Sequence, residues 1–281
     1  MADGNMMMLI PTLFTLPILV HSYPTNSTAK AMVVLTKIIS NIDGNHIHAL
    51  YHRTFNGKRL LQRFGGKRIM FVGDSVGYNQ WLSLVCMLHS AVPKAKYLLE
   101  TKGGLSTLTF PAHNVSVMFS RNDFLVDIVD DKNERILKLD SIRNGGQIWK
   151  DVDVLVFNTW NEGLQTGKKQ SWDFIEEGNA RHKDIDRLAA FEKALNTWAK
   201  WVNSTVDPKK TKILFQGGRH RGEAVLDKVL GRISKSVRLL NVTALSQLRK
   251  DGHPSSYGSS KVAVDCTQWC LPGRHGFQIN K

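Results

Sequence analysis

One serine in this chain has the surroundings of a nucleophile. The apolar run 69–72 leads into Gly73-Asp74-Ser75, and apolar residues then recur at helical spacing from Trp81 onwards. A strand, a tight turn and a helix expose a serine hydroxyl in α/β folds, and backbone N–H groups at the helix start can stabilise an oxyanion. Ser75 is therefore the candidate nucleophile. Taken alone, the three residues favour a plain strand-to-helix connection in which Asp74 or Ser75 caps the helix.

A second polar segment is expected at the same edge of the fold. Residues 152–157 form a nearly continuous apolar run, which is typical of a buried parallel strand, and Asn158-Thr159-Trp160 follow it directly. In parallel sheets the ligand lies beyond the carboxyl ends of the strands. Ser75, Asn158 and the loop 217–220 should therefore share one rim.

The elements that position these residues alternate between strand and helix. Strands are predicted at 69–72, 152–157, 213–216 and 237–242, and helices at 75–89, 185–202 and 223–234. Between them lie a predicted hairpin (105–110 with 115–119) and two short strands (124–129 and 136–139). This order predicts an α/β fold with a mainly parallel sheet.

Charge narrows the class of partner. Lys and Arg number 38 against 24 Asp and Glu, a net charge of +14, and such a surface attracts polyanions. No nucleic-acid-binding motif is present, so an acidic polysaccharide is favoured over nucleic acid, and an anionic membrane surface is a further alternative. The chain has three cysteines, Cys86, Cys266 and Cys270. Cys266 and Cys270 are spaced as a pair of metal ligands could be, but no second pair of ligands accompanies them, so no metal is expected.

The N-terminus indicates the secretory pathway. The apolar run 6–20 is short for a membrane span and suits a signal peptide or signal anchor within residues 1–22. Four N-x-[ST] triplets, beginning at Asn26, Asn114, Asn203 and Asn241, agree with passage through that pathway. A divergent segment, 23–60, is expected to separate this targeting segment from one large domain, 61–281.

Several stretches resemble one plant family, the trichome birefringence-like (PC-esterase) polysaccharide O-acetyltransferases. The chain looks like a truncated or divergent member. The matching stretches include KRIMFVGDSVGYNQWLSLVCML, GGLSTLTFPAHNVSVMFSRNDFLVDIV, DVLVFNTW, LLNVTALSQLRKDGHPSSYG and DCTQWCLPG. The resemblance implies an SGNH/GDSL-esterase-like three-layer fold. It also implies that Ser75 is the nucleophile, that Asp265 is the acid of the triad, and that Gln268 stands at the family's histidine position.

The same resemblance implies acetyl transfer through an acetyl-serine. The acceptor would be a plant cell-wall polysaccharide (xylan, pectin or another hemicellulose), and the net positive charge favours an acidic one. The donor would be acetyl-CoA or a similar co-substrate, with no bound cofactor. Glutamine cannot take the serine proton, so Gln268 predicts impaired activity. The alternatives are an inactive relative that binds polysaccharide, or an acetylesterase.

The resemblance also suggests roles for further residues and a location. Gly73, Asp74 and Asn158 are oxyanion candidates, although Asp74 could simply cap the helix and Asn158 could simply bond to its own loop. Trp160 and Trp269 are candidates for sugar stacking, and Arg219 for contact with acidic sugars. The expected location is the Golgi membrane or another part of the secretory pathway, with secretion to the cell wall as the alternative.

Overall fold

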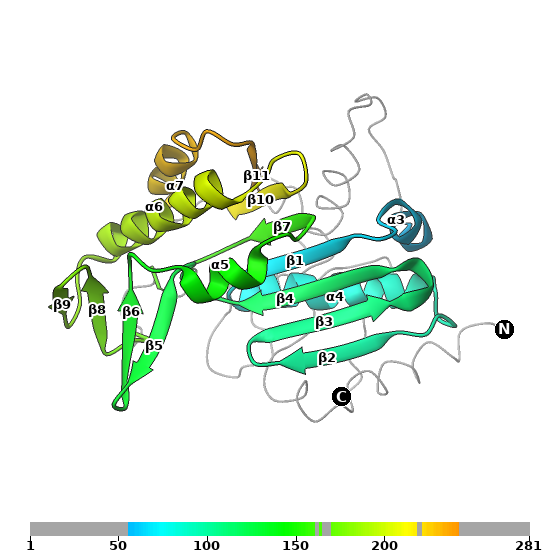
Figure 1. Cartoon of the computed structure of the whole chain (residues 1–281), viewed down its shortest axis with the longest axis horizontal. Helices are drawn as coiled ribbons and strands as arrows, with labels where there is room; N and C mark the ends of the chain where they lie inside the picture. Colours follow the sequence, from blue (N-terminus) through cyan, green and yellow to red (C-terminus); the bar gives the residue numbers. More distant parts are fainter. Residues whose placement is uncertain (1–55, 161–162, 165–169, 218–220, 242–281) are drawn as a thin grey trace, which may run out of the picture.

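A seven-stranded sheet forms the centre of the molecule (Figure 1). The computed structural model describes residues 56–160, 163–164, 170–217 and 221–241. In spatial order the strands are β11 (Val237–Asn241), β10 (Lys212–Gly217), β7 (Val154–Phe157), β1 (Arg68–Gly73), β4 (Val115–Arg121), β3 (Leu105–Phe110) and β2 (Leu98–Lys102). The first five are mutually parallel, which confirms the predicted mainly parallel sheet.

Apolar runs account for the central strands. β1 pairs with β4 on one side and β7 on the other, with Phe71 opposite both Phe119 and Val156. All four residues of β7 are buried. A strand covered on both faces needs apolar side chains in both directions, and for this reason the runs do not alternate with polar residues.

The hairpin prediction is also confirmed, and the structure adds a strand to it. β3 and β4 pair antiparallel around the short 3-10 helix η1 (Pro111–His113), and Asn114 follows it in a left-handed conformation. β2 then pairs with β3 at the edge of the sheet. No prediction covered β2, whose side chains are all exposed or half-buried.

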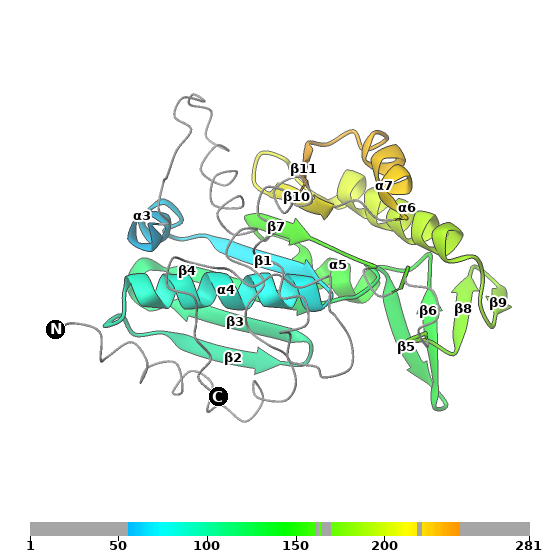
Figure 2. The ribbon, with the colours of Figure 1, turned by 180° about the vertical axis from the view of Figure 1, so that it is seen from behind.

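Helices cover the two faces of the sheet and make three layers. On one face α3 (Gly57–Arg63) and α4 (Ser75–Ala91) pack over Ile69 and Phe71 of β1. On the other face α5 (Arg143–Trp149), α6 (Arg187–Thr205) and α7 (Glu223–Leu230) share a core with Met70 and Val72. Figure 2 shows α4 crossing the sheet on the side opposite α5. The expected three-layer fold is therefore present.

A second, four-stranded sheet lies beyond the carboxyl ends of the parallel strands (Figure 1). Its order is β5 (Asp127–Asp131), β6 (Glu134–Lys138), β8 (Phe174–Glu177) and β9 (Ala180–His182). The two predicted short strands correspond to β5 and β6, whereas β8 and β9 were not predicted. Across the described ranges, no helix has the length and apolar character needed to cross a bilayer. Residues 1–22, which hold the predicted targeting segment, and residues 23–55 lie outside those ranges.

Candidate active site

The candidate nucleophile lies at the start of a long helix. β1 ends at Gly73, and α4 begins at Ser75, whose side chain is half-buried. Asp74 is the N-cap, and its carboxylate accepts a hydrogen bond from Val76 N at 3.0 Å. The first backbone N–H groups of a helix have no intrahelical acceptor, so this turn can stabilise negative charge near Ser75.

Asn158 is held against this turn. It follows β7, is 6% exposed, and its backbone N–H donates to Val72 O at 3.0 Å. Its Nδ2 donates to Asp74 Oδ1 at 2.5 Å. An amide nitrogen carries two hydrogens, so one remains beyond the bond to Asp74. The structure therefore brings together Gly73, Asp74, Ser75 and Asn158, which the sequence places on two separate strand ends.

Two glycines make room for the Asn158 side chain. A Cβ at Gly73, where φ is 156°, would lie 2.1 Å from Asn158 Oδ1, and one at Gly77 would lie 2.3 Å from the same atom. Any other residue at either position would displace the carboxamide. Gly77 was not predicted as part of the site. Its signal in the sequence is its spacing, since it lies four residues after Gly73 on the first turn of the helix.

The loop after β4 closes a third side of the turn. Arg121 pairs with Gly73 in the sheet register, and Asn122 N donates to Gly73 O at 3.0 Å. The Asp123 carbonyl accepts from Trp160 N at 3.0 Å and Thr159 Oγ1 at 2.9 Å. The loops after β1, β4 and β7 are thus joined by backbone hydrogen bonds.

Arg121 and Asp123 add charge at this edge, and sequence reasoning missed both. Their side chains form an ion pair at 3.1 Å, about half and a quarter exposed, so its contribution to stability is small. The other carboxylate oxygen of Asp123 is buried and has no partner among the residues that the structure describes. The available signal was position, because both follow a strand that ends at the rim.

α4 also forms a hydrogen bond with β10, which lies beyond β7 in the sheet. Gln80, which is 1% exposed, donates to the side chain of Gln216 near the end of β10.

Burial raises the pKa of the Cys86 thiol, and burial together with Cys86 raises the pKa of Tyr78 on the same helix. Within the described ranges no group of three His, Cys, Asp or Glu side chains could hold a metal ion.

Comparison with known proteins identifies the family. Residues 53–221 and 216–275 match the model of the PC-esterases, described as a GDSL/SGNH-like acyl-esterase family found in Pmr5 and Cas1p. The chain belongs to the PC-esterase family. Trichome birefringence-like 43 of Arabidopsis thaliana is 46% identical over 256 residues, covering 78% of this chain and 69% of that protein. Trichome birefringence-like 42 of the same plant is 43% identical over 271 residues, covering 82% and 75%.

One predicted site residue of this PC-esterase has a different role. Trp160 is 1% exposed, and its ring packs against Phe124, Trp172 and Phe191. Its Nε1 donates to Phe124 O at 3.0 Å. The interpretation as a sugar-stacking platform is wrong, because the ring has no free face to offer. Three further tryptophans, Trp81, Trp198 and Trp201, are also buried.

Other predicted residues of the PC-esterase site lie outside the described ranges. These are Arg219, Asp265, Gln268 and Trp269. Their roles therefore stay predictions. Among the described residues, the site consists of three parts. These are the turn Gly73-Asp74-Ser75 (the nucleophile turn), Asn158 held between Gly73 and Gly77 (the Asn158 clamp), and the loop after β4.

Proposed function

We propose that this PC-esterase is a polysaccharide O-acetyltransferase that works through an acetyl-serine at Ser75. The observation that carries the proposal is the pinned Asn158 carboxamide beside a half-buried serine at a helix N-terminus. Family membership supports chemistry of the acyl-esterase type. The plant origin of the relatives supports a cell-wall polysaccharide as acceptor, with xylan, pectin or another hemicellulose as the candidates.

The reaction would run in two steps. Ser75 Oγ attacks the carbonyl carbon of the acetyl donor, the bond to the donor's leaving group breaks, and an acetyl-serine forms. A sugar hydroxyl then attacks the same carbonyl carbon and restores the serine. In both steps the oxyanion would be stabilised by N–H groups at the start of α4 and by the second amide hydrogen of Asn158. No bound cofactor enters the scheme, and acetyl-CoA or a similar donor is the co-substrate.

Proton transfer is the weak step of this scheme. The serine proton must leave as the acetyl bond forms, and the family position for the base holds Gln268. An amide has no nitrogen that titrates near neutral pH. Loss of a triad base lowers the rate by several orders of magnitude, although oxyanion stabilisation and binding leave residual catalysis. Gln268 thus favours the second candidate, an inactive relative that binds polysaccharide.

Acetyl transfer separates the two candidates. The full chain, Ser75→Ala and Gln268→His would be incubated with acetyl-CoA and xylan or pectin oligomers, and product and acetylated Ser75 peptide measured by mass spectrometry. We expect transfer to increase in Gln268→His and to vanish in Ser75→Ala. Transfer that survives Ser75→Ala would remove Ser75 as the nucleophile. If folded wild type and folded Gln268→His both fail to transfer, the inactive relative is the correct assignment. Acetate release without sugar product would indicate an acetylesterase.

The net charge of +14 supports an acidic polysaccharide, such as a pectin or glucuronoxylan, because long-range attraction would concentrate such a chain at the surface. The apolar run 6–20 supports a secretory protein of the Golgi, held by an N-terminal anchor, or one secreted to the wall. Fractionation of plant cells expressing the full chain with a C-terminal tag tests the location.

A further inference from the structure

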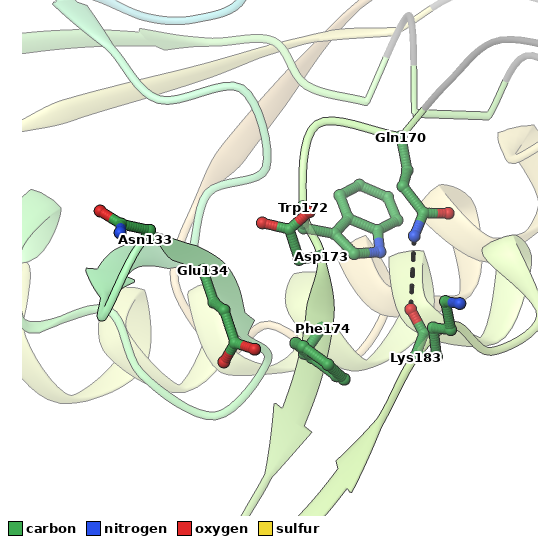
Figure 3. Close-up of a pocket in the computed structure, with 7 residues that line it drawn as sticks. All are labelled: Asn133, Glu134, Gln170, Trp172, Asp173, Phe174 and Lys183. Atoms are coloured by element: carbon green, nitrogen blue, oxygen red, sulfur yellow. Dashed lines mark hydrogen bonds between the residues drawn. The ribbon is translucent and has the colours of Figure 1, made fainter.

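A pocket of about 590 Å³ is lined by residues of the four-stranded sheet and its connections (Figure 3). This sheet lies on the side where the parallel strands of the seven-stranded sheet end (Figure 1). Its walls come from the turn between β5 and β6, from β8 with the residues before it, and from Lys183 after β9. Figure 3 shows Asn133 and Glu134 on one side and Gln170 and Lys183 on the other, with aromatic side chains between them. The volume falls within the usual range for small-molecule sites.

The polar groups of the pocket suit hydroxyls. The Asp173 carboxylate accepts from Arg135 N at 2.8 Å through Oδ2, so its second oxygen keeps accepting capacity. The Asn133 amide and the Lys183 ammonium supply donors in the same pocket. A sugar hydroxyl both donates and accepts, and it can therefore bond to each of these groups.

The charges of the pocket do not favour an anionic ligand. Glu134 is ion-paired with Arg181, which leaves Asp173 and Lys183 as one anion and one cation. A uronate would therefore meet no excess positive charge here, despite the net charge of the whole chain. Phe174, half-buried under the Arg181 guanidinium at 3.9 Å from its ring centroid, adds an apolar surface for the C–H face of a sugar.

The pocket is connected to the nucleophile turn through a packed aromatic pair. Trp172 in its wall lies 6.0 Å, centroid to centroid, from Trp160. Trp160 is two residues after Asn158, and two residues span at most about 7 Å. A polysaccharide repeats along its length, so a sugar held in the pocket can place another sugar of the same chain near Ser75.

We propose that this pocket binds a neutral sugar residue of the acceptor polysaccharide, a few residues along the chain from the sugar that reaches Ser75. The role as an acceptor subsite rests on the proposed transferase function, whereas the binding of neutral sugar does not. An acidic polysaccharide with a neutral backbone would then be bound through both the net positive charge of the protein and the neutral-sugar pocket. Its charged groups respond to the basic surface, and its neutral residues occupy the pocket.

Binding without an acetyl donor tests the proposal. Isothermal titration would compare xylohexaose, cellohexaose and mannohexaose with hexagalacturonate on the full chain, Phe174→Ala and Asp173→Asn. The matched control is Asp207→Asn, another exposed carboxylate that accepts one backbone N–H, from Lys209 at 2.9 Å. Asp173→Asn keeps an oxygen for Arg135 N, so it covers the case in which Phe174→Ala does not fold.

We expect at least one neutral hexasaccharide to bind, with affinity about five- to tenfold lower in Phe174→Ala and a few-fold lower in Asp173→Asn. Asp207→Asn should bind as wild type does, and the affinity for hexagalacturonate should be the same in both pocket variants as in wild type. The proposal is overturned if no neutral hexasaccharide binds, or if the folded pocket variants bind neutral hexasaccharides as wild type does. It is also overturned if the pocket variants change only the affinity for hexagalacturonate.

The two proposals fail separately. Ser75-dependent transfer with binding that ignores the pocket variants would retain the transferase and reject the subsite. Pocket-dependent binding without any transfer, in wild type or in Gln268→His, would retain a neutral-sugar site on an inactive relative.

Discussion

Gly77→Ala should reduce acetyl transfer far more than it reduces stability. The new Cβ would lie 2.3 Å from Asn158 Oδ1 and 3.4 Å from its Cγ, so the carboxamide must move. Gly77 lies within α4, where alanine normally adds about 1 kcal/mol to helix stability. Overpacking costs about 1–3 kcal/mol, so the free energy of unfolding should fall by about 0–2 kcal/mol.

Catalysis should respond more strongly, because the moved side chain is the one proposed to stabilise the oxyanion. Loss of one oxyanion donor lowers kcat by about 10²–10³. The rate of acetyl-serine formation would be measured in the Gln268→His background if wild type proves too slow. Thermal unfolding followed by circular dichroism would measure stability in the same preparations.

Gly104→Ala is the matched control. Its Cβ would meet only Arg121 O at 3.9 Å, an ordinary contact, so rate and stability should both stay near wild type. If Gly77→Ala forms acetyl-serine at the wild-type rate, then Asn158 either tolerates the displacement or does not act on the oxyanion. A wild-type rate would therefore refute the role that we assign to the Asn158 clamp.

Substitutions at three further residues probe the same region. Trp160→Phe loses the hydrogen bond to the Phe124 carbonyl and should cost about 1–3 kcal/mol of stability in urea titrations, while binding of xylohexaose stays unchanged. Asp74→Ala removes a cap and leaves the Asn158 amide without its buried acceptor, and should cost about 2–4 kcal/mol, with Asp74→Asn much milder. Burial raises the pKa of Tyr78, so the folded state holds that proton more tightly than the unfolded state. Stability is therefore lost as pH rises above about 10, and Tyr78→Phe should show a smaller fall in Tm between pH 9 and 11.

The central sheet could be predicted because its strands carry a strong local signal. β1, β7 and β10 are apolar runs, and the β3–β4 hairpin alternates on either side of a turn with proline. The helices α4 and α6 have apolar residues at helical spacing, and Trp198 and Trp201 on α6 are buried in the core. In these elements the positions that are buried are the positions that carry apolar residues in the sequence.

Elements held by distant contacts could not be predicted. β9 has only exposed residues, and it is a strand because it pairs with β8. α5 contains Gly145 and Gly146, which lower helix propensity, yet a Cβ at these positions would lie 2.5 Å from Trp149 and 2.6 Å from Trp201. The glycines are needed by the packing of tryptophans, and one of these lies over 50 residues away.

The site shows the same division. The sequence places Ser75 and Asn158 at strand ends, and the rule for parallel sheets brings those ends to one edge. It does not reveal that Asn158 fits between Gly73 and Gly77, because that depends on the distance between two loops. Trp160 was misassigned for a related reason. Its left-handed backbone, with φ of 59°, turns the ring into the core, and no periodicity marks a single residue in a loop.

The capping and catalytic interpretations of Gly73-Asp74-Ser75 are not alternatives. The same Asp74 oxygen accepts from Val76 N and from Asn158 Nδ2, so the cap of α4 is also the anchor of the oxyanion candidate. Packing and these two hydrogen bonds account for Gly73 and Asp74 without any reaction. Ser75 is different, because its hydroxyl forms no hydrogen bond within the part of the chain that the structure describes. Ser75→Ala should thus leave the free energy of unfolding within about 0.5 kcal/mol of wild type, and any loss of transfer would be chemical rather than structural.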